Sequence, residues 1–400
     1  MAKLLEITGK AISGEWGQDD DTGTGIPVLR TTNFTNEGFV NYKNVVTRSI
    51  SKKNIAEKYL RHGDVIIEKS GGSDKQPVGR VIFFEGEENK YLFNNFTGLL
   101  RVQNPEEWLP KYVFYALYAY YRNGGTRAFE NRTTGLHNLQ VDNYVKSVDI
   151  PKLSYRKQQH ICETLDHVRD AVAYRERQLT KLDELIKARF VEMFGDLVEN
   201  PKQFPCVLLG SIMTVMPQNG LYKPQSAYVQ DKFGTPILRI DGFYNGKVTD
   251  FNNLKRLCCT DFEKERYLLV ENDIVINRVN SIEYLGKCAR ISGLQEDTVF
   301  ESNMMRFHLD DSKVNSTYIT TVLCSQYIYR QILTRAKKAV NQASINQGDV
   351  QSLNVVVPPL SLQNQFADFV AEVDKSKVEV QKALDQTQLL FDSLMQQYFG

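Results

Sequence analysis

The sequence has little of several features that mark enzymes, metal sites and membrane proteins. It holds only five histidines, and its six cysteines form no C-x-x-C pair, so no zinc site is predicted and the thiols are expected to be reduced and buried. No run approaches the roughly 18 apolar residues of a membrane span, and the first residues lack the apolar core of a signal peptide. We therefore expect a cytoplasmic protein without membrane contact.

Motifs of catalysis are missing as well. There is no G-x-G-x-x-G, no phosphate-binding P-loop, no H-E-x-x-H and no nucleophile elbow G-x-S-x-G. We therefore predict a binding protein with no catalytic residue, metal or cofactor of its own. The formal net charge of +1 does not indicate nucleic-acid binding by bulk charge, so such binding would need segregated charge or partners that supply cations.

What is present is a duplication that fills the chain of 400 residues. Residues 150–195 and 357–400 both open with Pro-x-Leu-Ser and close on Phe-Gly, which are typical start and stop signals of a helix. The parts before them also correspond, and each reads as mixed α and β. The strand-like run 26–30 recurs at 235–239, the run 59–69 at 267–278, the helix 110–121 at 316–329, and a polar loop 123–138 at 337–346.

Each of the two long segments carries apolar residues at alternating spacings of four and three. Such a seam needs a partner helix, and the second copy supplies one in antiparallel orientation. At roughly 1.5 Å per residue each helix would be about 60 Å long, so we expect two similar domains at opposite ends of a rod. The predicted seam comprises Leu165, Val168, Val172, Leu179, Leu182 and Ile186 in the first helix and Val373, Val380, Leu384, Phe391 and Leu394 in the second.

Three cations interrupt the seams: Arg175, Arg189 and Lys377. One interpretation is that they extend along the seam edge or pair with a facing carboxylate. The other is that they fix the register of the antiparallel pair, as polar seam residues can.

Together these features resemble the DNA-specificity subunit of type I restriction–modification systems. The resemblance rests on the repeated Pro-Ile/Val-Leu-Arg and Asp-Ile/Val-Val/Ile-Ile strands, on the Pro-x-Leu-Ser-x-x-x-Gln entry to each helix, and on the linker Met193-Phe194-Gly195-Asp196. It implies an α+β fold with two pseudo-symmetric target recognition domains, residues 1–149 and 199–356. A central spacer helix at 150–198 and a C-terminal spacer helix at 357–400 would pair as an antiparallel coiled coil.

The resemblance also implies partners. Each recognition domain would read one half of a bipartite site in double-stranded DNA, and the helices would set the spacing and dock two methyltransferase subunits and motor–nuclease subunits. S-adenosylmethionine, ATP and Mg would be bound by those partners and not by this chain. Two alternatives remain: a specificity subunit of a type IIB or phage-exclusion methylation system, or a coiled-coil scaffold of two protein-binding domains without a DNA role.

Candidate DNA contacts are side chains suited to base edges or phosphates that recur at matching places in both domains. Arg30 and Arg239 end the repeated strand and would make either a phosphate contact or a structural ion pair. The other candidates are Lys69, Ser70, Lys75, Gln76, Arg127, Asn131, Arg132, Thr133, Thr134 and His137 in the first domain, and Arg278, Asn280, Ser281, Lys337, Lys338, Asn341, Gln342 and Ser344 in the second. The aromatic helix face from Tyr112 to Tyr121 is predicted to be core instead of a base-stacking platform.

Overall fold

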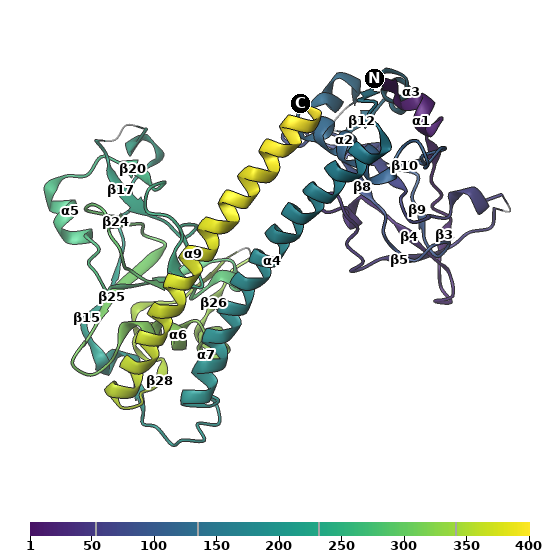
Figure 1. The fold of residues 1–400 in the computed structure, drawn as a ribbon. Coiled ribbons are helices and arrows are strands. Elements are labelled where there is room, and N and C mark those ends of the chain that lie inside the picture. The colour runs from purple at the N-terminus through teal and green to yellow at the C-terminus, as the bar shows by residue number, and fades with distance from the viewer. Residues whose placement is uncertain (53, 134–135, 231–232, 341) are drawn as a thin grey trace. The chain divides into compact units, whose positions relative to one another are not determined.

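The computed structural model describes residues 1–400 except 53, 134–135, 231–232 and 341, and describes only the backbone at 132, 133 and 136. The chain forms two units (Figure 1). Unit 1 comprises Met1–Arg177 and Val380–Gly400, and unit 2 comprises Gln178–Glu379. Each unit therefore includes part of both long helices.

The described residues of unit 1 form four sheets and three shorter α-helices. The sheets are β2-β10-β6-β8, β3-β5-β4-β9, β11-β12-β7 and β1-β13. The strands are β1 (Ala2–Lys3), β2 (Ile12–Ser13), β3 (Gln18–Asp19), β4 (Ile26–Leu29), β5 (Val46–Ser49), β6 (Val65–Glu68), β7 (Ser70–Gly72), β8 (Val81–Phe83), β9 (Leu92–Phe93), β10 (Thr97–Leu100), β11 (Glu130–Thr133), β12 (Leu136–Leu139) and β13 (Asp149–Ile150). The helices are α1 (Leu4–Thr8), α2 (Pro110–Arg122) and α3 (Val141–Ser147).

Unit 2 repeats these sheets in the same order, as β15-β25-β21-β23 extended by β19-β18, β16-β20-β17-β24, β26-β27-β22 and β14-β28. Its strands are β14 (Cys206–Leu208), β15 (Met213–Asn219), β16 (Tyr228–Val229), β17 (Thr235–Leu238), β18 (Phe243–Tyr244), β19 (Gly246–Val248), β20 (Lys255–Leu257), β21 (Ile274–Asn277), β22 (Val279–Asn280), β23 (Cys288–Arg290), β24 (Val299–Phe300), β25 (Met304–Leu309), β26 (Lys337–Lys338), β27 (Ala343–Ser344) and β28 (Asn354–Val356). Its shorter helices are α5 (Asp261–Tyr267), α6 (Ser316–Leu323), α7 (Gln326–Arg335) and α8 (Gln347–Gln351).

Two local predictions were wrong. The supposed polar loops 123–138 and 337–346 contain the hairpins β11–β12 and β26–β27, because a third strand provides backbone partners that a sequence window does not contain. The helix expected at 316–329 is broken into α6 and α7. Ser325 lies between them, and its side chain accepts a hydrogen bond from the Ile328 amide, which starts a second helix.

The long helices are α4 (Tyr155–Phe194) and α9 (Leu360–Phe399), teal and yellow in Figure 1. In unit 2 the rings of Phe190 and Phe366 lie 5.4 Å apart, while Asp183, earlier in α4, pairs with Lys377, later in α9. Moving from the first contact to the second, the residue number falls in α4 and rises in α9. The two helices are therefore antiparallel. The predicted α+β class and helix pairing are confirmed.

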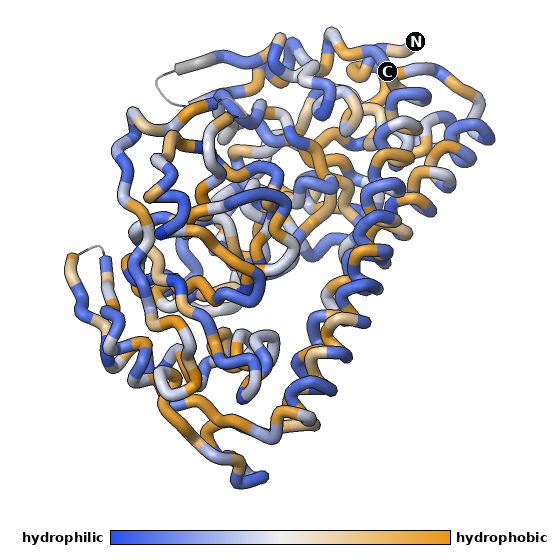
Figure 2. The backbone as a smooth tube through the Cα atoms, turned by 90° about the vertical axis from the view of Figure 1, so that its left-hand side faces the viewer, coloured by the Kyte–Doolittle hydropathy of each residue, from blue (hydrophilic) through white to orange (hydrophobic). Residues whose placement is uncertain are grey.

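The seam residues behave as the spacing requires. Each of the residues predicted for the seam is buried or half-buried, and apolar and polar segments alternate along the helices in Figure 2. Of the three interrupting cations, Lys377 pairs with Asp183 of the facing helix, and Arg189 pairs with Glu192 of its own helix at 2.8 Å. Arg175 donates to the Ala171 carbonyl of its own helix.

The structural equivalent of Gln158 at the start of the second long helix is not the glutamine that the motif spacing selects. The backbone amide of Gln158 donates to the carbonyl of Ser154, and the backbone amide of Gln363 donates to the carbonyl of Pro359. Gln363 therefore occupies the place of Gln158, although the Pro-x-Leu-Ser-x-x-x-Gln spacing selects the exposed Gln365. The second copy reaches the same position with a different local sequence.

Each unit has its own core, and both long helices contribute to each core. In unit 1 the predicted aromatic face of α2 is core, since Tyr112, Phe114, Tyr115 and Tyr118 are buried. The six cysteines are free, but the expected burial holds only for Cys162 and Cys288, whereas Cys206, Cys258 and Cys324 are exposed and Cys259 is half-buried. Among the described residues, no helix is long and apolar enough to span a bilayer.

Candidate nucleic-acid interface

A small three-stranded sheet recurs in both units and gathers most of the candidate residues. In each unit a strand directly after a core strand pairs with a distant hairpin: β7 follows β6 and joins β11–β12, and β22 follows β21 and joins β26–β27. Asn138 thereby lies opposite Ser70, and Ala343 lies opposite Asn280. We call these the β7 sheet and the β22 sheet.

The candidates on or directly next to these two sheets come from segments that are more than 50 residues apart. For the β7 sheet they are Lys69, Ser70, Asn131, Arg132, Thr133 and His137, with Arg132 and Thr133 placed by their backbone pairing alone. For the β22 sheet they are Arg278, Asn280, Ser281, Lys337, Lys338, Gln342 and Ser344. Thr134 and Asn341 lie outside the described residues.

A short loop after β7 carries Lys75 and Gln76 and is closed by a hydrogen bond of 2.7 Å from the Ser73 amide to the Gln76 carbonyl. Arg127 reaches this loop and donates to the carbonyl of Asp74. His137 is only 8% exposed, and its Nδ1 lies 3.1 Å from Glu130, which also accepts from the Val78 amide. The His137 ring is thus held inside the sheet and offers less surface to a ligand than its neighbours.

Arg30 and Arg239 lie elsewhere, directly after β4 and β17 of another sheet. The Arg30 guanidinium donates to the carbonyl of Asn44. The Nε of Arg239 lies 3.6 Å from Glu301 and 3.8 Å from Asp241, so this residue has the ion-pair environment that was one of its two predicted roles.

Lys69 and Arg278 occupy equivalent places. Each donates its backbone amide to the carbonyl of the residue directly before β10 or β25, and each accepts through its carbonyl from the amide of Leu139 or Ile345. The Lys69 side chain donates to the hydroxyl of Ser13 at 2.9 Å. Burial, together with the nearby charge of Lys58, lowers the pKa of Lys69. The Arg278 side chain donates to the Ser302 carbonyl.

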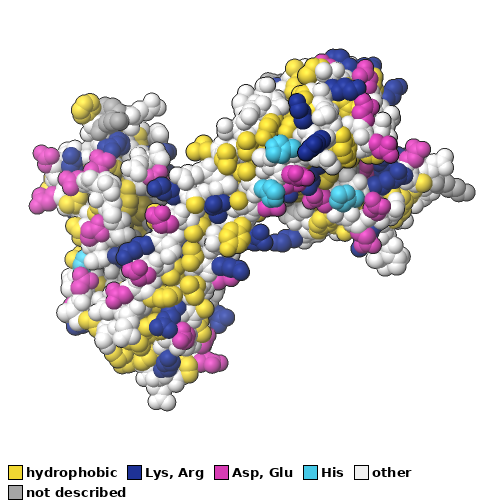
Figure 3. All heavy atoms as spheres, in the orientation of Figure 1, with side chains coloured by type: hydrophobic (Ala, Val, Ile, Leu, Met, Phe, Trp, Pro, Cys, Tyr) yellow, Lys and Arg dark blue, Asp and Glu magenta, His cyan; other side chains and the backbone are white. Residues whose placement is uncertain are grey.

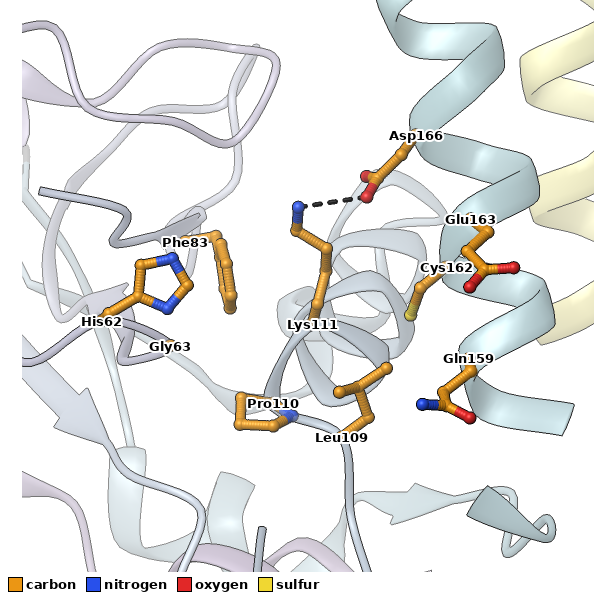
Figure 4. Close-up of a pocket in the computed structure, with 10 residues that line it drawn as sticks. All are labelled: His62, Gly63, Phe83, Leu109, Pro110, Lys111, Gln159, Cys162, Glu163 and Asp166. Carbon is orange, nitrogen blue, oxygen red and sulfur yellow. Dashed lines mark hydrogen bonds and ion pairs between the residues drawn. The ribbon is translucent and has the colours of Figure 1, made fainter. Parts of the chain in front are cut away.

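A hollow of about 370 Å³ lies where the start of α4 meets α2 and β8 in unit 1 (Figure 4). Lys111 points across it to Asp166 of α4, at 3.1 Å, and also pairs with Glu85 at 2.9 Å. Tyr115 donates to the same Asp166 carboxylate. Lys111, Glu85 and Asp166 are thus paired within the chain, and these contacts attach the helix to the domain.

Sequence reasoning missed a second group of cations in unit 1: Arg48, Lys52 and Lys58, gathered around Glu15 and Trp16. Arg48 lies in the short strand β5, and the two lysines lie in the connection that follows it, so only the density of lysines at 52–58 marks this group in the sequence. On the visible face in Figure 3, basic and acidic side chains are interspersed within each unit, in line with the near-neutral total charge. Among the described residues no cluster of ligands suited to a metal ion is found.

Comparison with known proteins gives matches to specificity subunits of one kind. Residues 201–387 match the model of the type I restriction modification DNA specificity domain. The chain is 24% identical over 399 residues to the type I restriction enzyme EcoKI specificity subunit of Escherichia coli, covering 94% of this chain and 82% of that one. These matches confirm the predicted resemblance to type I restriction–modification specificity subunits.

Two further similarities extend this result. A Methanocaldococcus jannaschii protein that bears the name type I restriction enzyme MjaX specificity subunit is 30% identical over 196 residues, which are 48% of this chain but only 44% of that protein. The crystal structure of the type I restriction–modification S subunit from M. genitalium has the same fold over 100% of this chain and 95% of that one, with a TM-score of 0.57 and 15% identity. The structural similarity confirms the predicted fold.

Proposed function

We propose that this specificity subunit reads a bipartite site in double-stranded DNA, with recognition domains at 1–149 and 199–356 each reading one half. The observation that carries the proposal is the recurrence of the β7 sheet as the β22 sheet, each presenting side chains suited to base edges. The two sheets carry different residues, such as Asn131 in the first and Lys337 and Lys338 in the second. Different residues would read different bases, so the proposed site is asymmetric.

The proposed role of the helices 150–198 and 357–400 is to hold the two readers at a fixed spacing and to dock two methyltransferase subunits, with motor–nuclease subunits in the same complex. The chemistry then belongs to those partners, which would bind S-adenosylmethionine, ATP and Mg, and this chain would supply no catalytic group. Such a complex would act in the cytoplasm.

The near-neutral charge supports one further part of the proposal. DNA affinity depends largely on cations that replace the counterions of the phosphates, and a chain of net charge +1 supplies few in excess. We therefore propose that the partner subunits complete a clamp around the DNA. Nanomolar binding of cognate DNA by the isolated chain at physiological salt would contradict this part.

The decisive experiment is methylome sequencing of a host that expresses this chain together with its methyltransferase. A bipartite methylated motif that disappears without this chain is the expected result. A specificity subunit of a type IIB or phage-exclusion system would also give a motif, and the neighbouring genes separate these cases. A scaffold without a DNA role predicts no motif even with the partner present.

A further inference from the structure

A second hollow of unit 1 has a volume of about 530 Å³, and Lys69 is hydrogen-bonded to Ser13 of its wall. It is lined by the turn from β2 to β3, by the segment after β5 and by Lys58, with Trp16 and Asn95 in its wall. Ser13, which accepts the hydrogen bond of Lys69, is part of the same wall. We call this hollow the lysine hollow.

Its positive charge exceeds its negative charge. Lys52 bonds to both oxygens of Glu15, at 3.0 and 2.8 Å, and Lys58 bonds to the same carboxylate. The hydrogen bonds from Lys52 and Lys58 lower the pKa of Glu15, so the carboxylate is ionised at neutral pH. A single carboxylate thus serves two lysines.

Lys69 adds a third cation that is half-buried. Among the described residues it has no carboxylate partner, and its side chain donates to a neutral hydroxyl. Partial burial of an ammonium group costs free energy unless a counter-charge is near, and the adjacent Lys58 increases this cost. An anion in the lysine hollow would relieve both effects.

The lysine hollow also adjoins the β7 sheet. Lys69 lies between β6 and β7, and its carbonyl accepts the amide of Leu139 in β12 at 2.8 Å. In protein–DNA complexes, half or more of the hydrogen bonds go to the phosphate and sugar backbone, and they fix the position of the residues that read bases. A phosphate bound here would lie next to bases that contact the β7 sheet.

The described residues of unit 2 do not form the same arrangement. The amide of Leu221 donates to Phe300 as the amide of Glu15 does to Phe93, so an apolar residue takes the place of Glu15. Nearby, Lys223 pairs with Glu263 at 2.7 Å, one cation to one anion. The surplus of lysines is therefore a property of unit 1.

We propose that the lysine hollow binds one phosphodiester group of the DNA backbone, with Lys58 and Lys69 as its cationic ligands and Glu15 positioning Lys52 and Lys58. This inference rests on the proposed function, because it assumes that the β7 sheet faces DNA.

The test uses the complex with its methyltransferase and a duplex containing the methylated motif. Single phosphates are replaced one at a time by uncharged methylphosphonates. For the wild type, replacement at one position in or beside one half-site should weaken binding about 10-fold. With Lys58→Met and Lys69→Met, which keep the apolar stems, the unmodified duplex should bind as weakly and the effect of that replacement should vanish. The slope of log K against log salt should fall by about one.

Three matched variants sharpen the result. Lys90→Ala removes an exposed lysine of the same unit that pairs with Glu87, and it should leave the methylphosphonate profile unchanged. Lys69→Arg should retain the sensitive position. Glu15→Gln should strengthen DNA binding at low salt, because Lys52 and Lys58 lose their carboxylate partner.

An unchanged methylphosphonate profile in the double variant would overturn the proposal. Methylation of a relaxed motif by the double variant would also overturn it, because a relaxed motif indicates the loss of a base contact. Inhibition by inorganic phosphate without a change in the profile would indicate a site for free anions and would also overturn it. If the wild-type complex does not distinguish the motif from a scrambled duplex, the proposed function itself fails. Failure of the phosphate site and failure of the proposed function therefore give different results.

Discussion

Gln158 and Gln363 hold equivalent buried positions at the starts of the two long helices. The Gln158 side chain accepts from the Leu109 amide at 2.8 Å and donates to the carbonyls of Glu107 and Leu153. The Gln363 side chain accepts from the Asn315 amide at 2.9 Å and donates to the carbonyl of Pro358. In both units the side-chain amide of a fully buried glutamine thus joins the helix start to the segment before α2 or α6.

Replacing either buried glutamine by alanine should destabilise the unit concerned. The substitution leaves buried backbone groups without partners, at a cost of about 1–3 kcal/mol for each group. Urea unfolding followed by circular dichroism measures the effect. The controls are Gln159→Ala and Gln365→Ala, both at exposed positions, which should cost less than about 0.5 kcal/mol. Equal effects of Gln363→Ala and Gln365→Ala would refute the assigned correspondence.

Arg175→Leu should raise the stability of the helix pair and lower its pairing specificity. Arg175 lies on the seam but donates only to its own helix, to the Ala171 carbonyl at 3.3 Å, and a leucine there would bury apolar surface worth about 1 kcal/mol. Thermal unfolding measures the stability, and reconstitution with the methyltransferase measures assembly. Arg177→Leu, at an exposed position of the same helix, controls for the change of charge. Unchanged assembly and site spacing would count against a register role.

Removing one heptad from both long helices should shorten the spacer of the DNA site and leave both half-sites intact. The antiparallel pairing of Asp183 with Lys377 makes 173–179 and 381–387 a matched pair of deletions. Seven residues correspond to about 10 Å of helix, or about three base pairs. Methylome sequencing gives the motif directly. The matched control removes 173–179 alone, which should misalign the seams and impair assembly, and an altered half-site would show that the helices do more than set spacing.

Asn131→Ala should relax one half of the methylated motif, and Asn280→Ala should relax the other. Asn131 is exposed on β11, and Asn280 lies on β22, so the two belong to equivalent sheets of different units. A bidentate contact between asparagine and adenine contributes about 1–3 kcal/mol of discrimination. Motif frequencies from methylome sequencing provide the measurement, with Lys90→Ala as the variant expected to change neither half. Relaxation of both halves by one substitution would argue against independent reading.

The stability of the Glu68→Gln variant, measured relative to that of the wild type, should increase as the pH rises. Burial raises the pKa of Glu68, with Arg80 at 3.6 Å opposing this effect in part. A raised folded pKa means that the contribution of this group to stability is fully present below the unfolded pKa near 4.5 and is lost as the pH rises through the folded pKa. Glutamine does not ionise, so the variant does not lose this stability. Urea midpoints at pH 4 and pH 8 provide the comparison.

The exposed Glu87 serves as the control for that comparison. Its side chain is 68% exposed, so Glu87→Gln should give a difference from the wild type that hardly changes between the two pH values. A constant difference for Glu68→Gln would contradict the assigned burial effect. The equivalent residue of unit 2, Asn277, is already neutral and fully buried.

The sequence by itself determined the duplication, the two long helices and their seams, because these depend on local periodicity and end signals that a linear pattern contains. It also indicated the strands β4, β6, β17 and β21, whose β-branched runs are bounded by turn residues. The break between α6 and α7 was not apparent, since an apolar run continues across Ser325.

Only the tertiary structure decided which polar residues come together. The β7 sheet joins Ser70 to Asn138, and the lysine hollow joins Ser13, Lys58 and Lys69. Such juxtapositions depend on backbone pairing between distant segments, which no local pattern encodes. The correspondence of Gln158 with Gln363 was also a tertiary result, because burial against the segment before α2 or α6 selects the glutamine, and spacing from the proline does not.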